Sequence, residues 1–174
     1  RASSKVNDDC MAEFEALIRP GITEKEMAEA IRGIYAAHGC SGVSFPPICG
    51  FGAHAADPHH DNDDTPLEAG QCVLIDVGGV YQDYCSDMTR TFFTGEPSEE
   101  ERKVYELVRQ AQAAAEALVK PGVRLCDIDT AARDLITEAG YGPYFNHRLG
   151  HFIGLEDHEA GDVSTAVSYT HLRA

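Results

Sequence analysis

The fold of this chain is decided by the stretch Asp76-Val77-Gly78-Gly79-Val80-Tyr81-Gln82-Asp83-Tyr84-Cys85-Ser86-Asp87. Strand-favouring runs flank it, Val73-Leu74-Ile75 before and Thr91-Phe92-Phe93 after, and the Gly-Gly pair lies between them. This pattern is typical of a β-hairpin. A turn at Tyr81 and Gln82 predicts that Asp76 and Asp87 face each other across the two strands, with Cβ atoms about 4.5–5.5 Å apart.

Two facing carboxylates need a compensating charge. At this separation they repel each other by roughly 3 kcal/mol at an effective dielectric near 20. A proton shared by the two carboxylates would relieve the repulsion, and so would divalent cations, since the metals of dinuclear hydrolases lie about 3.5–4 Å apart. In the alternative, a slipped register leaves one aspartate in solvent. The hairpin alone leaves these alternatives open.

Composition narrows the class of protein. The 174 residues suffice for one globular domain with a hydrophobic core. The formal net charge is −15, and Lys and Arg form no cluster, so neither nucleic acid nor an anionic membrane is an expected partner. No apolar run approaches the roughly 18 residues that span a bilayer. The six cysteines lack Cys-x-x-Cys spacing, which favours reduced thiols in a cytoplasmic protein.

Two helices are predicted before the hairpin. An apolar stripe indicates one over residues 7–19, and a capping box of Thr23 and Glu26 begins a second that ends at Gly39. Residues 44–52 are apolar and interrupted by proline, which indicates an edge strand or a loop. A polar loop with three histidines follows over residues 53–64.

Two more helices are predicted after the hairpin. A second capping box, Ser98 with Glu101, begins a long helix that ends at Pro121-Gly122. Asp127 is then expected to cap a helix that stops at Gly140. The last part of the chain, residues 141–159, is rich in glycine and histidine and is expected to be irregular or stranded.

The chain contains an internal repeat. Residues 17–22 read Leu-Ile-Arg-Pro-Gly-Ile, and residues 118–123, 101 positions later, read Leu-Val-Lys-Pro-Gly-Val. Pro-Gly is a common way to end a helix, so the match could have arisen independently in the two places. Two helix-Pro-Gly-helix units nevertheless favour duplicated α+β halves about a pseudo-two-fold axis. Strands of both halves would then share one sheet, so that the hairpin and the histidine-rich stretch line one cleft.

The histidine-rich stretch places His147, His151 and His158 within twelve residues. Neutral imidazole is the commonest protein metal ligand, and histidine is also the usual proton carrier near pH 7. A helical His-Glu-x-x-His zinc site is excluded because Arg148 occupies the Glu position.

Four motifs, in order and with suitable spacings over residues 7–165, carry a family resemblance. They are the Asp76 and Asp87 pair, Asp87-Met88-Thr89-Arg90, Pro58-His59, and Gly150-His151-(x)2-Gly154-(x)3-His158-Glu159. Together they resemble the pita-bread metallopeptidases, in particular the aminopeptidase P and prolidase (Xaa-Pro dipeptidase) branch. The resemblance implies an α+β pita-bread (creatinase/aminopeptidase) fold, and a proline-specific exopeptidase that cleaves the Xaa-Pro bond of dipeptides or at peptide N-termini.

The resemblance also implies a metal site. Asp76 would be the bidentate carboxylate, Asp87 the bridging carboxylate and His151 the imidazole ligand of two divalent ions. An oxygen-rich set with one nitrogen suits Mn²⁺, with Co²⁺ or Zn²⁺ as alternatives. Such ions polarise the scissile carbonyl and generate the nucleophile from water.

Three further histidines match the family residues around the substrate. The resemblance assigns His158 to stabilising the tetrahedral intermediate, and His59 and His147 to positioning the peptide and moving protons. The neighbouring His60 is the alternative to His59, and a structural role is the alternative for His147. The expected partner is a peptide with proline in second position, and the full-length protein is expected to be a homodimer.

The sequence departs from the family pattern at its end. The family uses five protein ligands, and the last two are glutamates downstream that nothing after Glu159 supplies. Residues 166–174 resemble translated sequencing-adapter DNA and are expected to pack against nothing. We therefore expect residues 1–165 to be a partial catalytic domain, residues 166–174 to be a non-native tail, and this chain alone to bind metal weakly and to be inactive.

Two other functions remain to be weighed. A methionine aminopeptidase would share the metal ligands, but the Asp-x-Thr-Arg and Gly-Leu-x-x-His-Glu signatures resemble the proline branch more closely. A non-catalytic pita-bread module that binds peptides or proteins belongs to a different class. Such a module would be expected to lose metal ligands, and the three within this sequence are present.

Overall fold

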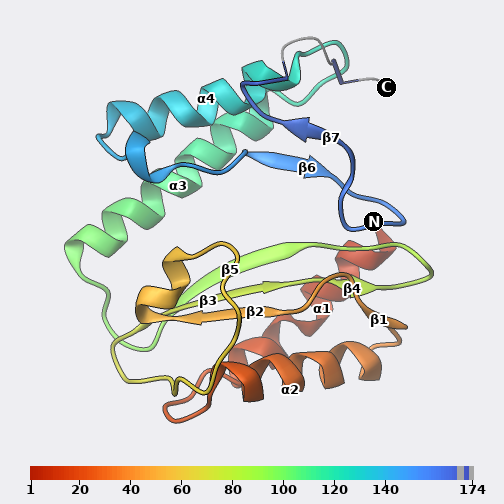
Figure 1. Cartoon of the computed structure of the whole chain (residues 1–174), viewed down its shortest axis with the longest axis vertical. Helices are drawn as coiled ribbons and strands as arrows, with labels where there is room; N and C mark the ends of the chain where they lie inside the picture. Colours follow the sequence, from red (N-terminus) through yellow and green to blue (C-terminus); the bar gives the residue numbers. More distant parts are fainter. Residues whose placement is uncertain (168–170, 173–174) are drawn as a thin grey trace. The chain divides into compact units, whose positions relative to one another are not determined.

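The computed structural model describes residues 1–167 and 171–172 and divides into two compact units (Figure 1). The first unit comprises Arg1–Pro97 with Ile153–Glu159, and the second Ser98–Phe152 with Ala160–Ala174. Each unit combines helices with paired strands, as the predicted α+β class requires. Among the described helices, none combines the length and the apolar character needed to traverse a lipid bilayer.

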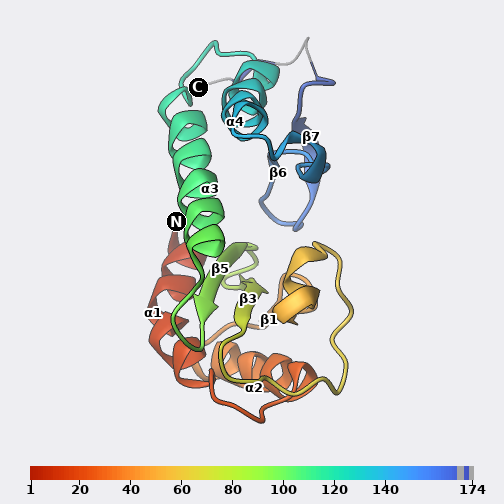
Figure 2. The ribbon, with the colours of Figure 1, turned by 90° about the vertical axis from the view of Figure 1, so that its left-hand side faces the viewer.

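The first unit is a small sheet covered by two helices. Its elements are α1 (Ala2–Ala16), α2 (Glu24–Ala37), β1 (Gly42–Val43), β2 (Ile48–Phe51), the 3-10 helix η1 (Gly52–Ala56), β3 (Cys72–Val77), β4 (Gly79–Val80) and β5 (Met88–Phe93). Strands β2, β3 and β5 form an antiparallel sheet in that order, and β1 pairs with β4. Helices α1 and α2 lie on one side of this sheet and η1 on the other (Figures 1 and 2). The predicted edge strand is β2.

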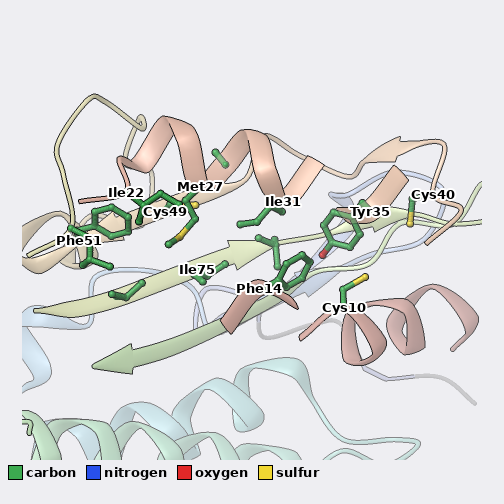
Figure 3. Close-up of a cluster of buried hydrophobic side chains, with 14 of the residues drawn as sticks. Cys10, Phe14, Ile22, Met27, Ile31, Tyr35, Cys40, Cys49, Phe51 and Ile75 are labelled. Atoms are coloured by element: carbon green, nitrogen blue, oxygen red, sulfur yellow. The ribbon is translucent and has the colours of Figure 1, made fainter. Parts of the chain in front are cut away.

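The core of this unit lies between the helices and the sheet. Alternate residues of β3, namely Val73, Ile75 and Val77, are buried, as expected for a strand with one face on a core. Figure 3 shows the helix side chains that meet this face, among them Phe14, Met27, Ile31 and Tyr35. Burial raises the pKa of the Cys10 and Cys49 thiols in this core to about 12, so both are neutral packing groups.

The hairpin has a different register from the one predicted. Asp76 pairs with Thr89 rather than with Asp87, because the chain turns at Gln82 and Asp83, which have φ angles of 52° and 64°. Two successive residues with positive φ form the tight turn whose twist matches that of antiparallel strands. Since side chains alternate along a strand, Asp87 lies on the same face as Asp76 and diagonal to it.

The second unit contains two helices and a strand pair. Its elements are α3 (Glu99–Ala117), α4 (Leu125–Glu138), η2 (Gly142–Tyr144), β6 (Gly150–Phe152) and β7 (Glu159–Val163). The capping boxes predicted for α2 and α3 are both present. The predicted cap of α4 is wrong, because Arg124 is the N-cap residue. Asp127 instead forms an ion pair with Arg124, with a closest N–O distance of 2.6 Å.

The two units repeat the same local pattern. Each has two helices joined by a Pro-Gly turn, and the turn glycines Gly21 and Gly122 have φ angles of 89° and 86°. The glycines after the second helices, Gly39 and Gly140, have φ angles of 83° and 90°. Such left-handed conformations favour glycine at helix ends, so the repeat read from the sequence corresponds to repeated backbone geometry.

The expectation that the tail packs against nothing is wrong for its described part. Leu172 exchanges two backbone hydrogen bonds of 2.9 Å with Gly122 and Val123, and its side chain packs on the core of the second unit. These contacts mirror those of Leu67 with Gly21 and Ile22, both 2.8 Å long. Tail residues 168–170 and 173–174 lie outside the described residues, and the boundary at residue 165 stays a prediction.

Candidate functional site

The hairpin presents two carboxylates on the face of the sheet that α1 and α2 do not cover. Asp76 lies on β3 between the buried Ile75 and Val77, and its carboxylate Oδ1 accepts a 2.7 Å hydrogen bond from the Thr89 hydroxyl. Asp87 directly precedes β5 and is exposed. Alternation of side chains along the hairpin therefore predicts that the two acidic residues share a face, in diagonal rather than directly opposite positions.

The hairpin also anchors the loop that carries His158. The backbone N–H of Cys85 donates to the Gly154 carbonyl at 2.8 Å, and its thiol lies 3.5 Å from the Leu155 carbonyl oxygen. The same loop is closed by the Glu159 carboxylate, which accepts a 2.8 Å hydrogen bond from the backbone N–H of Leu155. His158 is 60% exposed, and its Nδ1 lies 3.0 Å from Asp157 Oδ2.

His147 and His151 belong to the second unit, and each ring is oriented by a backbone carbonyl. The Nδ1 of His147 lies 2.9 Å from the Arg148 carbonyl oxygen, and that of His151 lies 3.1 Å from the Phe152 carbonyl oxygen. Because a carbonyl only accepts, Nδ1 carries the proton in both rings. A neutral His151 therefore has its lone pair on Nε2, the arrangement that metal-ligating histidines usually show.

The two adjacent histidines after η1 have different surroundings. His59 is exposed, and its backbone N–H donates to the Asp57 carboxylate at 2.9 Å. His60 instead turns inward, and its Nε2 lies 2.6 Å from the carboxylate of Glu24. The structure thus gives His60 a partner in the protein interior, whereas the role of His59 stays a prediction.

Comparison with known proteins identifies the family. The whole chain, residues 1–174, matches metallopeptidase family M24. It belongs to this family. An uncharacterized peptidase of Staphylococcus aureus (strain MSSA476) is 42% identical over 168 residues, which are 97% of this chain and 48% of that protein. The chain thus spans about half the length of the relatives it matches.

Solved structures of M24 proteins share the fold of this chain. The X-Pro aminopeptidase of Thermotoga maritima MSB8 superimposes with a TM-score of 0.95 at 37% identity, over 99% of this chain and 49% of that one. For the prolidase of Pyrococcus furiosus the TM-score is 0.94 at 36% identity, over 98% and 50%. The predicted pita-bread fold is therefore confirmed, and this chain corresponds to about half of a complete example.

Enzymes of family M24 are metal-dependent, and the residues of this M24 chain fit a metal by their chemistry. Asp76 is held by Thr89 through one carboxylate oxygen, and His151 donates its Nδ1 proton to a carbonyl. Hydrogen bonds that fix the orientation of a carboxylate and the tautomer of a histidine are the usual support of metal ligands. Each of the two residues, within its own unit, thus has the hydrogen-bonded support that a ligand of a divalent cation usually has.

A buried ion pair supports the histidine segment of the second unit. Asp129 on α4 is fully buried and accepts two hydrogen bonds from the Arg133 guanidinium, 2.9 and 3.0 Å long. It also accepts from the backbone N–H groups of Leu149 and Thr165. Arg133 in turn donates to the carbonyl of His147 at 3.0 Å. The pair therefore fixes the backbone on both sides of Arg148.

A second buried carboxylate organises the loop after β2. Glu24 is fully buried, and its two oxygens lie 2.9 Å from His54 Nδ1 and 2.6 Å from His60 Nε2. The backbone N–H groups of Phe51 and Asp63 also donate to it, both at 3.1 Å. The hydrogen bond to Glu24 raises the pKa of His54. Ligand atoms of the three side chains lie within 4.8 Å of one another and could hold a metal ion.

Neither buried carboxylate has a signal in the sequence. Glu24 follows a capping residue and resembles an ordinary acidic residue of a first helical turn. Asp129 and Arg133 resemble a solvent-exposed i,i+4 pair. The backbone N–H groups that donate to the two carboxylates lie 20 to 39 residues away along the chain, which no local pattern reveals.

Proposed function

We propose that this chain is part of a proline-specific metallo-exopeptidase that hydrolyses the Xaa-Pro bond of dipeptides or at peptide N-termini. The observation that supports it is the hairpin register, in which Asp76 pairs with Thr89, so that side-chain alternation predicts Asp87 on the face of Asp76, in a chain of family M24. The similarity to an X-Pro aminopeptidase and to a prolidase favours proline-directed cleavage over the methionine aminopeptidase alternative.

Each of the three proposed ligands has a separate role. Asp76 would bind through both carboxylate oxygens, Asp87 would bridge, and His151 would contribute Nε2. When bound, two divalent ions, which we propose to be Mn²⁺ with Co²⁺ or Zn²⁺ as alternatives, would polarise the scissile carbonyl and supply a nucleophilic water. Two aspartates on one strand pair carry the negative charge that such ions need.

The remaining histidines would act on the substrate. His158 is exposed beside Asp157, whose carboxylate orients the ring, and we assign it to donating a hydrogen bond to the developing oxyanion. His59 and His147 would position the peptide and transfer protons. We further propose that the full-length protein is a cytoplasmic homodimer.

The proposal is tested with a protein that carries this sequence at the full length of its relatives. We expect it to cleave an Xaa-Pro dipeptide or an Xaa-Pro peptide with Mn²⁺ present, and not the same substrate with alanine in place of proline. Asp87→Asn should lower kcat/KM at least about a hundredfold, because loss of a metal ligand costs more than loss of a supporting hydrogen bond.

Asp83→Asn is the matched control, because Asp83 is an exposed turn residue of the same hairpin and should leave kcat/KM unchanged. The 174-residue chain alone should be inactive, since it offers three of the five ligands that the family resemblance implies. Cleavage of Met-Xaa substrates without proline, or full activity of Asp87→Asn, would contradict the proposal.

A further inference from the structure

The cluster of Glu24, His54 and His60 uses none of the residues assigned to the peptidase site. Its three side chains come from three segments of the first unit: the first residue of α2, the 3-10 helix η1, and the loop before β3. The sequence separations are 30 and 36 residues. The fold itself therefore assembles the cluster.

The arrangement of the ligand atoms suits a metal ion. Ligands at right angles or tetrahedral angles around an ion, each about 2.0–2.2 Å from it, lie about 2.9–3.4 Å apart. His54 Nδ1 lies 2.9 Å from one Glu24 oxygen, and His60 Nε2 lies 2.6 Å from the other. The two rings lie together, with centroids 4.2 Å apart. An ion between the rings and the carboxylate thus requires only small shifts.

The charge of Glu24 favours a cation in this position. Its carboxylate is fully buried, and the polar partners that the structure shows for it are two imidazoles and two backbone N–H groups. A buried carboxylate is stable only with compensating charge or hydrogen bonds. A divalent ion can replace the two imidazole donors, while the N–H groups of Phe51 and Asp63 keep the carboxylate in place.

We propose that Glu24, His54 and His60 form a second metal site, for a borderline transition-metal dication of the Zn²⁺ or Co²⁺ class. Two imidazoles and one carboxylate are a ligand set that zinc enzymes use, with water at the open positions. The side chain of His54 is 35% exposed, which gives solvent access to those positions. The ion would tie the loop that carries His59 to α2, whether or not the chain belongs to a proline-specific peptidase.

The site is tested in the 174-residue chain with Asp76→Asn and Asp87→Asn, which remove the hairpin carboxylates. The chain is freed of metal with a chelator and titrated with Zn²⁺ by calorimetry and with Co²⁺ by visible absorption. We expect one ion per chain. His54→Asn should weaken binding by at least about tenfold. Asparagine offers an N–H donor near the position of Nδ1, so that it preserves the hydrogen bond to Glu24 but removes the metal ligand.

His38→Ala is the control, because His38 also lies beside a carboxylate, with its Nε2 2.5 Å from Glu13, but among the described residues this pair belongs to no group of three potential metal ligands. It should leave the stoichiometry and the affinity unchanged. Zn²⁺ should also raise the Tm of the parent chain and of His38→Ala, but not that of His54→Asn. Absence of binding, or equal binding by the parent chain and His54→Asn, would show that the cluster is only a hydrogen-bonded clamp and would overturn the proposal.

Discussion

Asp129→Ala is expected to lower the free energy of unfolding by about 3–5 kcal/mol, the usual cost of removing one partner of a buried ion pair. The substitution leaves Arg133, whose side chain is only 27% exposed, without its carboxylate. It also leaves the N–H groups of Leu149 and Thr165 without their acceptor. Because the chain contains no tryptophan, unfolding in urea is best followed by far-UV circular dichroism.

Asp134→Ala provides the comparison for this result. Asp134 lies on the same helix, is exposed, and should change the free energy of unfolding by no more than about 0.5 kcal/mol. A loss below about 1 kcal/mol for Asp129→Ala, or equal losses for the two variants, would show that the buried pair does not hold the segment that leads to His151.

Gly78→Ala is expected to destabilise the chain by about 3 kcal/mol or more, at the upper end of overpacking costs. A Cβ on Gly78 would lie 2.8 Å from the carbonyl carbon of Ser86 and would overlap its oxygen. Those atoms belong to the backbone of the opposite strand, so no side-chain rotation relieves the clash. The strand would have to move, and with it Asp87, the next residue. The free energy of unfolding in urea measures the effect.

Gly33→Ala is the matched control. Gly33 lies within α2 and is exposed, and a methyl group added to it would meet no atom within 4 Å. Alanine is a better helix former than glycine, so this variant should gain up to about 1 kcal/mol. If Gly78→Ala were as stable as the parent chain, the close approach of the two hairpin strands would be refuted.

Local rules in the sequence predicted four helices, although the first spans Ala2–Ala16 rather than the predicted residues 7–19. The two capping boxes involve residues three positions apart, so Thr23 with Glu26 and Ser98 with Glu101 specify their helix starts without tertiary information. The rule failed at Asp127, because an arginine three residues earlier binds its carboxylate. Arg124 is also close in sequence, but it binds the Asp127 carboxylate through its charged guanidinium, whereas a capping side chain accepts a hydrogen bond from a backbone N–H.

The hairpin register was harder to predict. The turn occupies Gln82 and Asp83, although glycine and asparagine are the residues that usually accept positive φ. The Gly-Gly pair serves close packing instead, since a Cβ on Gly79 would lie 2.7 Å from Cys40 Sγ and 2.8 Å from the Tyr35 ring. These contacts join distant parts of the chain, and no single stretch of sequence contains them.

In the candidate site, too, contacts between residues far apart in sequence could not be predicted. The aspartates and histidines of the family motifs were visible because their spacing is a property of the sequence. Glu24 and Asp129 were not, because their function in the fold is to bind loops that lie 20 or more residues away. Buried carboxylates of this kind become apparent only once their backbone donors are located in space.

Binding of a divalent metal ion by Asp76, Asp87 and His151 is the property on which the peptidase assignment depends. The most direct test is a Mn²⁺ titration of the 174-residue chain carrying His54→Asn, followed by electron paramagnetic resonance of the free ion. We expect weak but measurable binding, which Asp76→Asn, Asp87→Asn and His151→Ala each reduce at least about tenfold. Equal Mn²⁺ binding by the His54→Asn chain with and without each of these three substitutions would contradict the assignment.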